Sequence, residues 1–574
     1  MGDDNTSAKS YLSQQIKLMT ISTTDLFTDE EYEAYLGVVN TARALNEEEL
    51  RFKKHKLRDP TVKQALLEEK RRHQQALATL IAKHEGAPRA INLKLILDSR
   101  LTDEHTRYAT WQTLKPSRKI QEFSSEFSRA MGLAQDEVTF DKIIVKWKSE
   151  DILRQIVTSG FDLAVFENGE IKRKHYVLLT ASAGQLRTDK VQFIEEQTWL
   201  RIQSRLMCGL SFDEINRKGG INVNKLLAYI ALACSATDPW TDFDIDRSIV
   251  IDDFEAPVQG LVDFIDKDYN LERCVKETVI THTDGIGMML PRVSRKNFQI
   301  RAPWIKGLMT SFDFLRFCEE NHIEPKLTDI YGKTHDLVDE DIRVIFTKSQ
   351  FKLYKYYDSW EDYKQRFKKN GCTFNLANAE DDYVKDTSIN YQMIQTLTSI
   401  TEEEIDAFVS RTHSRIKNLS SSAQSMLEAL NARPDSPFPY QRSLAIYPEL
   451  LRDGYSKEAL KALKLRMLLD AKSGAIKCEN KRLFAIPDMY AACEYWFKGE
   501  ERPVGILRDG EIACRAYRHL DEADCLRSPH LYMEHAIRTI VHDSDVYSWF
   551  YTNGVYTSCH DLISKILQFS TENL

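Results

Sequence analysis

Two segments of the sequence have glycines, one of them beside a lysine, in a pattern that suits a phosphate group. Segment 282–291 contains Gly285, and segment 298–307 ends in Lys306 and Gly307. Glycine permits tight turns and close approach of the backbone, and a lysine at such a corner can reach a phosphate as a flexible point charge. On their own these two segments give only a weak signal, and an ordinary turn is the favoured interpretation of the spacing.

A third segment, 345–354, carries polar side chains at alternate positions. In a strand, Lys348, Gln350 and Lys352 lie on one face, while Phe351 and its apolar neighbour lie on the other. A face with two lysines suits a triphosphate or another polyanion. The alternative is a solvated strand face that binds nothing.

In the C-terminal part, an arginine stands two positions before a proline. Arg527, Pro529 and His530 stand close together, and Lys565 follows in segment 554–569. Proline restricts the backbone of a turn and would direct Arg527. The guanidinium offers a fork of donors that suits hydroxyl and phosphate oxygens.

Common motifs of nucleotide and metal chemistry are absent from the sequence. It contains no G-x-x-x-x-G-K-[ST] loop, no H-E-x-x-H, no G-x-S-x-G and no EF-hand loop. The dense aspartate cluster at 242–246 could hold Mg²⁺ in a tight turn, but it lacks a glycine, so we favour a solvated acidic loop. The 10 cysteines form no C-x-x-C pair. Their scatter argues against a zinc or redox site and favours reduced thiols in the cytosol.

The composition is that of a globular protein. Of 574 residues, 42% are hydrophobic and 29% are charged, and 78 basic against 86 acidic residues leave a net charge of −8. The 22 glycines and 15 prolines exclude collagen-like and low-complexity classes, and the length suggests about three to five domains. No apolar run is long enough to span a membrane, and the polar start lacks the features of a secretory signal. We therefore expect a cytoplasmic protein with no membrane partner, in which a local basic groove can still meet nucleic acid.

Periodicity predicts a mixture of helices and strands. A capping-box pattern from Thr28 to Glu31 follows what we expect to be a mobile start, and Pro60 divides residues 46–85 into two helices that could form a hairpin. The expected strands are 143–147, 163–166, 175–180, 248–253, 277–281, 297–301 and 341–357, with a hairpin turn at 167–170. The expected helices are 193–206, 223–233, 390–397, 402–416, 423–430 and 456–470. Residues 482–569 read as mixed strand and turn.

Five short motifs of the sequence resemble those of the two-barrel RNA polymerases, and they follow one another along the chain in the same order as in that family. This superfamily includes the large subunits of multisubunit polymerases, the silencing-type RNA-dependent RNA polymerases and the single-chain polymerases of phages and prophages, which look closest. Trp304-Ile-Lys-Gly-Leu is similar to Asn-Lys-Gly-Val, and Thr347-Lys-Ser-Gln-Phe-Lys is similar to the Arg-Pro-Ser-Gln-x-Lys of the silencing enzymes. Asp284-Gly-Ile-Gly resembles Asp-Gly-x-Gly. Asn390-Tyr-Gln-Met-Ile resembles the helix that follows the Arg-Pro-Ser-Gln-x-Lys segment in the silencing enzymes. Arg527-Ser-Pro-His-Leu resembles Arg-Ala-Pro-Thr-Leu-His.

The resemblance covers about residues 245–569 and implies an α+β fold. A helical N-terminal region would be followed by two double-psi β-barrels joined by a helical segment. The implied domains are a helical segment 1–90, an α+β domain 91–245, a first barrel 246–375, a helical connector 376–475 and a second barrel 476–574, incomplete at its C-terminus. The implied activity is template-directed ribonucleotidyl transfer, with a nucleic acid template, product RNA and ribonucleoside triphosphates as partners.

The same resemblance assigns roles to residues. The implied catalytic residues are Lys306, Lys352 and Arg527. The residues implied to bind nucleotide or nucleic acid are Arg301, Lys348, Gln350, Asp284, Gly285, Gly307, Pro529, His530 and Lys565.

The sequence departs from this family at the metal site. The family signature Asp-x-Asp-Gly-Asp, which would follow a segment like 562–569, is absent, and the tail of the chain contains only Glu572 as an acid. Two-metal phosphoryl transfer needs clustered carboxylates around ions about 3.5–4 Å apart. We therefore expect the N-terminal part of a single-chain RNA polymerase, whose Mg²⁺ site comes with a missing segment or a second polypeptide. An intron, a split gene and a frameshift all fit.

Two other functions stay open at this point. A catalytically inactive remnant could bind nucleic acid or regulate, in which case binding would depend on salt without any synthesis. A helix-rich interaction protein with no nucleic-acid role is the third hypothesis. The sequence does not decide whether the template is DNA or RNA.

Overall fold

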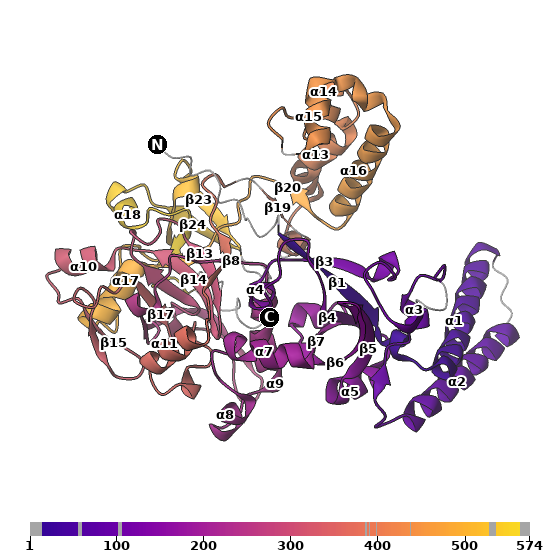
Figure 1. Cartoon of the computed structure of the whole chain (residues 1–574). Coiled ribbons are helices and arrows are strands. Elements are labelled where there is room, and N and C mark those ends of the chain that lie inside the picture. Colours follow the sequence, from indigo (N-terminus) through magenta and orange to yellow (C-terminus); the bar gives the residue numbers. More distant parts are fainter. Residues whose placement is uncertain are drawn as a thin grey trace. The chain divides into compact units, whose positions relative to one another are not determined.

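The computed structural model describes residues 14–55, 60–101, 106–384, 387–389, 391–395, 397, 399–436, 438–526 and 535–562. It forms two compact units between which the chain passes several times (Figure 1). Unit 1 comprises Met1–Val250, Gln299–Gly307 and Gln350–Asn378, and unit 2 comprises Ile251–Phe298, Leu308–Ser349 and Ala379–Leu574. The expected α+β class is confirmed, with an N-terminal helical region and several mixed sheets.

Unit 1 begins with a seven-stranded mixed sheet of order β2-β5-β6-β7-β4-β1-β3. Its strands are β1 (Gln15–Ser22), β2 (Arg89–Ala90), β3 (Lys119–Phe123), β4 (Val138–Lys146), β5 (Phe161–Glu167), β6 (Glu170–Thr180) and β7 (Lys190–Glu195). The first strand pairs antiparallel with β3 and parallel with β4. We expected only a mobile start and a helix before residue 45, so this inner strand was not predicted.

The predicted hairpin between β5 and β6 is confirmed. Asn168 and Gly169 form its turn with φ angles of 55° and 85°, values that asparagine and glycine adopt most readily. Phe161 and Tyr176 then face one another across the pair, with ring centroids 5.2 Å apart and both side chains fully buried. This aromatic pair anchors the register of the sheet, because a one-residue slip would turn both rings out of the core.

Helices α1 (Asp29–His55) and α2 (Pro60–Lys83) pack side by side as the predicted hairpin (Figure 1). The capping box is present: the Thr28 amide donates to the Glu31 carboxylate over 2.9 Å, and the Glu31 amide donates to the Thr28 hydroxyl over 3.3 Å. Pro60 occupies the first position of α2, where its missing N–H costs nothing.

The rest of unit 1 adds short helices and a second group of strands. The helices are α3 (Leu93–Ile96), α4 (Glu126–Ala130), α5 (Glu150–Ser159), α6 (Ala183–Leu186), α7 (Glu196–Leu206), α8 (Phe212–Arg217), α9 (Val223–Ile230) and α11 (Trp360–Lys369). The strands are β8 (Asp238–Pro239), β9 (Ser248–Ile251), β13 (Phe298–Ala302), β14 (Ile305–Ser311) and β18 (Asn375–Ala379). Four of these strands are hydrogen-bonded neighbours in the order β8-β18-β13-β14. The helix expected to start at residue 193 starts at Glu196, because the preceding residues complete β7.

Unit 2 contains a long ribbon, a small sheet and helices. The ribbon pairs β10 (Glu255–Ile265) with β11 (Leu271–Thr281), and β12 (Ile286–Met289) pairs in parallel with the end of β14 and antiparallel with β17 (Val344–Thr347). Two further antiparallel pairs are β15 (Lys326–Thr328) with β16 (Thr334–Asp336), and β19 (Ser388–Ile389) with β20 (Ile476–Lys477). The strand expected over 341–357 is therefore shorter and ends at Thr347.

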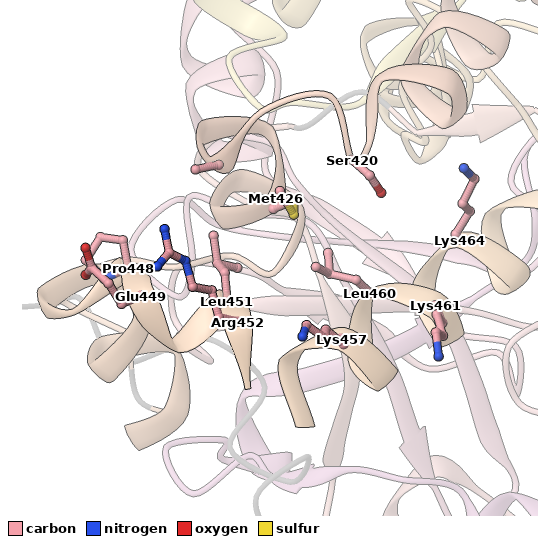
Figure 2. Close-up of a pocket in the computed structure, with 11 residues that line it drawn as sticks. Ser420, Met426, Pro448, Glu449, Leu451, Arg452, Lys457, Leu460, Lys461 and Lys464 are labelled. Atoms are coloured by element: carbon pink, nitrogen blue, oxygen red, sulfur yellow. The ribbon is translucent and has the colours of Figure 1, made fainter. Parts of the chain in front are cut away.

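The helical part of unit 2 surrounds a hollow (Figure 2). Its helices are α12 (Tyr391–Gln395), α13 (Glu402–Asn418), α14 (Ala423–Ala429), α15 (Pro439–Ile446) and α16 (Gly454–Lys472), and α10 (Phe314–Glu320) lies earlier in the chain. The helices expected at 402–416, 423–430 and 456–470 are confirmed, and α15 was not predicted. Pro439, which could equally end a helix, here begins α15.

The C-terminal part of unit 2 is a five-stranded mixed sheet of order β21-β25-β22-β24-β23. Its elements are β21 (Ala485–Pro487), α17 (Met489–Cys493), β22 (Glu511–Cys514), β23 (Glu522–Cys525), β24 (Ala536–Ile540), α18 (Ser544–Trp549) and β25 (Val555–Thr557). In the part of the chain that the structure describes, no helix combines the length and apolar character needed to cross a membrane.

Candidate nucleotide-binding site

The backbones of Lys306 and Lys352 flank a single antiparallel bridge in unit 1. Ile305 and Phe351 form this bridge. On one side, the Lys306 amide donates to the Gln350 carbonyl over 3.2 Å, and on the other the Lys352 amide donates to the carbonyl of residue 304 over 2.8 Å. Both lysines are half-buried. The two lysines that the sequence singled out separately are therefore brought together by local β pairing.

An aromatic core supports this bridge. Phe351 is fully buried, and its ring lies 4.7 Å from that of Tyr363 and 5.5 Å from that of Trp360. The Tyr363 hydroxyl donates to the Pro303 carbonyl over 2.8 Å, and the Trp304 indole N–H donates to the Met207 carbonyl over 2.9 Å. Burial raises the pKa of Tyr363 well above its ordinary value, so this phenol stays a donor. The lysine backbones are consequently mounted on a rigid support.

Arg301, on β13, is a cation in a poorly solvated place. Burial lowers the pKa of its guanidinium, and the structure gives it no carboxylate partner among the described residues. One guanidinium nitrogen donates to the carbonyl of Ile300 over 2.7 Å, while Nε is buried with no hydrogen-bond partner among those residues. A buried, uncompensated cation is costly, and an anion nearby would relieve that cost.

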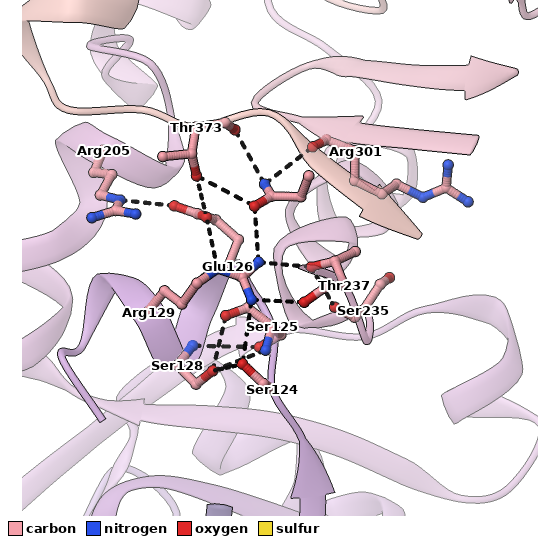
Figure 3. A network of polar contacts seen from close by, with 11 residues as sticks. Ser124, Ser125, Glu126, Ser128, Arg129, Arg205, Ser235, Thr237, Arg301 and Thr373 are labelled. Carbon is pink, nitrogen blue, oxygen red and sulfur yellow. Dashed lines mark hydrogen bonds and ion pairs between the residues drawn. The ribbon is translucent and has the colours of Figure 1, made fainter. Parts of the chain in front are cut away.

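A buried polar network fixes the backbone at Arg301 (Figure 3). The Asn375 side-chain amide donates to the Arg301 carbonyl over 3.1 Å, and Asn375 Oδ1 accepts from Arg129 over 2.8 Å. Glu126, at the start of α4, accepts from Arg205 over 2.7 Å and from the Thr373 hydroxyl over 2.5 Å. In Figure 3 the Arg301 side chain extends away from these groups, so the network holds its backbone and leaves its guanidinium for another role.

Unit 2 places the predicted glycine turn beside a buried aspartate. The Gly285 amide donates to the Ser349 hydroxyl over 2.7 Å, and that hydroxyl donates to Asp253 over 2.6 Å. The Ser349 amide and the Thr283 hydroxyl also donate to Asp253, over 2.9 and 3.3 Å. Burial raises the pKa of Asp253, while these hydrogen bonds oppose the rise. Asp284 lies in the same turn, with φ positive at Gly285 (70°).

Sequence reasoning missed Asp253, Glu126 and their partners. The signal for Asp253 was weak but present, because it is an aspartate two positions after the buried strand β9, where the chain turns. Nothing local distinguishes Glu126 from an ordinary first-turn glutamate of a helix. Its hydrogen-bond partners Arg205 and Thr373 lie more than 70 positions away in sequence.

The expected alternation of Lys348, Gln350 and Lys352 on one face is wrong. Because β17 ends at Thr347, the segment turns, and Gln350 is fully buried together with Phe351. Lys348 is half-buried and forms an ion pair of 2.7 Å with Asp252, whose side chain is 66% exposed. Gly307, half-buried, follows Lys306 on β14. The roles assigned to these residues stay predictions.

The second group of predicted site residues, Arg527, Pro529, His530 and Lys565, lies outside the described residues. The described chain between these masked segments, 535–562, contains a bidentate pair between Arg538 and the buried Asp561, with one nitrogen–oxygen distance of 2.9 Å. The hydrogen bonds to Asp561 raise the pKa of Arg538.

The described residues do not fit a Mg²⁺ site. No group of three or more His, Cys, Asp or Glu side chains among them could hold a metal ion. In the acidic segment 242–246, Asp246 pairs with Lys368 over 2.6 Å, and Asp244 pairs with Arg247 over 3.6 Å. No catalytic step through the ion follows from these residues.

The structure is a mixed α+β fold in which Lys306, Lys352 and Arg301 lie on or beside paired strands. The model of the family "RNA dependent RNA polymerase" matches residues 118–490, which is more than half of the chain. The chain belongs to this family. It is also 39% identical over 574 residues to "DNA-directed RNA polymerase YonO" of Bacillus phage SPbeta, a match that spans 98% of this chain and 64% of the relative's length.

Proposed function

We propose that this chain forms the nucleotide-facing and nucleic-acid-facing part of a template-directed RNA polymerase. The proposal includes two double-psi β-barrels, at 246–375 and 476–574, joined by the helical connector 376–475. The family match and the phage relative support a polymerase-type function. The template is a separate question, because the family description names RNA and the description of the relative names DNA.

The observation that carries the proposal is the cation arrangement around one β bridge. Lys306 and Lys352 have their backbones on either side of it, and Arg301 on β13 is a half-buried cation without a carboxylate partner in the described residues. A triphosphate or an RNA phosphate would supply a negative charge beside Arg301, which has no carboxylate partner among the described residues. Charge-assisted hydrogen bonds to phosphate oxygens then hold the ligand in one position.

The metal-binding aspartates form the second part of the proposal. The sequence contains no Asp-x-Asp-Gly-Asp, so we propose that polypeptide additional to these 574 residues supplies it, with its Mg²⁺. A fusion of this chain to the part of the phage relative that has no counterpart here tests this idea. Incorporation of labelled ribonucleotides on DNA and RNA templates is the readout, and the unfused chain is the control.

Lys306→Ala and Lys352→Ala test the site in the same fusion. Loss of one preorganised cation from charge stabilisation lowers the rate by roughly 10²–10³-fold. Lys368→Ala is the matched control, because Lys368 lies in the same unit but pairs with Asp246. Photocrosslinking of an azido-labelled ribonucleoside triphosphate to the chain alone gives a readout that does not need activity. Unchanged rates and unchanged crosslinking in both variants would refute the site.

The second candidate function is a catalytically inactive nucleic-acid-binding protein. It is favoured by one observation, that no group able to hold a metal occurs among the described residues. It predicts salt-dependent binding of RNA or DNA, because displaced counterions drive such binding. It also predicts no synthesis by any fusion, together with normal crosslinking of nucleic acid.

A further inference from the structure

A groove in the helical part of unit 2 combines an apolar floor with a basic rim (Figure 2). The cavity has a volume of about 540 Å³. Met426 on α14, Leu451 in the short 3-10 helix Pro448–Arg452 and Leu460 on α16 form the apolar floor. Leu451 and Leu460 are buried in the small core of these helices, and Met426 packs against that core. The floor is thus a fixed surface, held by the packing of the helices beneath it.

The rim carries four cations and one carboxylate. Lys457, Lys461 and Lys464 lie along one face of α16, since their spacing matches helical turns, and Arg452 precedes that helix. All four are exposed. Lys461 pairs with Glu458 over 2.6 Å, whereas the structure shows no ion pair for the other three within the ranges that it describes. Glu449 is the single acidic residue of the lining, so the groove is electropositive.

We propose that this groove docks an acidic amphipathic helix of a partner protein. An amphipathic helix places apolar side chains three and four positions apart into such a floor, and its flanking carboxylates meet a basic rim. Charge complementarity gives the orientation, and apolar burial gives the affinity. This interaction is separate from nucleotide addition and does not depend on it.

The chemistry of the floor favours a peptide over a nucleic acid strand. Single strands bind through aromatic side chains on which bases stack, together with cations that follow the backbone. The groove has the cations, but its lining contains no aromatic residue. Phosphates and sugars would leave the apolar floor in contact with water, whereas leucine or isoleucine side chains of a helix would fill it.

Exposed apolar side chains extend the surface beyond the groove. Ile446 and Tyr447, which immediately precede the lining residue Pro448, are 79% and 58% exposed. Apolar exposure of this kind beside a charged rim is typical of protein-binding surfaces.

Fluorescence anisotropy of the full chain with a synthetic peptide tests the proposal. The probe is a fluorescein-labelled helix of about 18 residues, long enough to be partly helical, with leucines along one face and glutamates elsewhere. A peptide of identical composition with the leucines scrambled around the helix is the first control. A labelled single-stranded RNA of equal length is the second. We expect the amphipathic peptide to bind at least tenfold more tightly than the scrambled peptide.

Two charge-reversed variants locate the binding. Lys457→Glu with Lys464→Glu leaves the Lys461–Glu458 pair intact and should weaken peptide binding at least tenfold. Arg466→Glu with Lys472→Glu makes the same change of charge on α16 outside the groove lining, and should leave binding within twofold. Met426→Gln, which changes the floor without changing charge, should weaken binding severalfold, and far-UV circular dichroism shows that each variant is folded.

Three outcomes would overturn the proposal. Equal binding of the amphipathic and scrambled peptides would mean that the floor contributes nothing. Equal loss in both charge-reversed variants would mean non-specific attraction to net charge. RNA binding that falls in the groove variant, while the peptide does not bind, would assign the groove to nucleic acid instead.

Discussion

The polar network around Glu126 and the groove around Lys461 both contain several cations, but the cations of the two regions differ in burial and in their partners. In the network the cations are largely buried, and each has acceptors: Arg205 donates to Glu126, and Arg129 donates to Thr237 and Asn375. In the groove the cations are exposed, and only Lys461 has a carboxylate partner in the described part of the chain. The difference separates charge that holds the fold together from charge that is available to a partner.

Removal of the Glu126 side chain should lower the unfolding free energy more than any other change considered below. Glu126→Ala leaves Arg205 and Arg129 partly buried without their carboxylate, and breaking such a pair costs about 3 kcal/mol of unfolding free energy. Urea denaturation followed by circular dichroism measures it. Glu126→Gln, which keeps an acceptor of the same shape, should cost less. A Glu126→Ala protein as stable as the wild type would show that the network does not carry the fold.

Asp253 offers an intermediate case, because its carboxylate is held by hydroxyl and amide donors and has no cation among its hydrogen-bond partners. Asp253→Asn should lower the unfolding free energy at neutral pH by about 1–2 kcal/mol, since the NH2 group of asparagine cannot accept hydrogen bonds and leaves buried donors without a partner. The same denaturation experiment checks this value.

The pH dependence sharpens that test. Burial raises the pKa of Asp253 in the folded protein above its ordinary value of 3.8, so the folded state binds more protons than the unfolded state just above that pH. Relative to Asp253→Asn, the wild type should therefore lose stability as pH rises from 3.8 through the raised pKa, and should show no further change above it. A difference between the two proteins that is independent of pH would contradict the raised pKa.

The groove should give the smallest effect on stability. Glu458→Ala removes the partner of Lys461, but both side chains are 72% exposed, and such pairs contribute less than about 0.5 kcal/mol. Thermal unfolding should detect almost no change. A loss comparable to that of Glu126→Ala would remove the distinction between the two regions.

Local signals predicted local structure. The capping box at Thr28, the Asn168-Gly169 turn and the break at Pro60 each depend on residues within a few positions of one another. They were therefore readable from the sequence. The register of the N-terminal sheet was not, because β1 pairs with partners about a hundred positions away in the sequence.

For the candidate site, too, the sequence indicated individual residues but not the contacts between distant segments. Lys306 and Lys352 stood out by residue type and spacing, but the bridge between Ile305 and Phe351 that joins them could not be derived from either segment alone. Gln350 was placed with the lysines by strict alternation, which failed because the strand ends at Thr347. Long-range polar partners such as Asn375 carry no periodic pattern, so their role appeared only in three dimensions.

The position of β1 inside the N-terminal sheet affects how this protein folds while the ribosome is still making it. Its parallel partner β4 leaves the ribosome only after roughly 120 further residues, a delay on the order of 10 s at typical elongation rates. During that interval the α1–α2 hairpin can already form, because its contacts are local, while the edges of β1 remain without neighbours. The nascent chain therefore carries an apolar strand that chaperones would be expected to cover until β4 emerges.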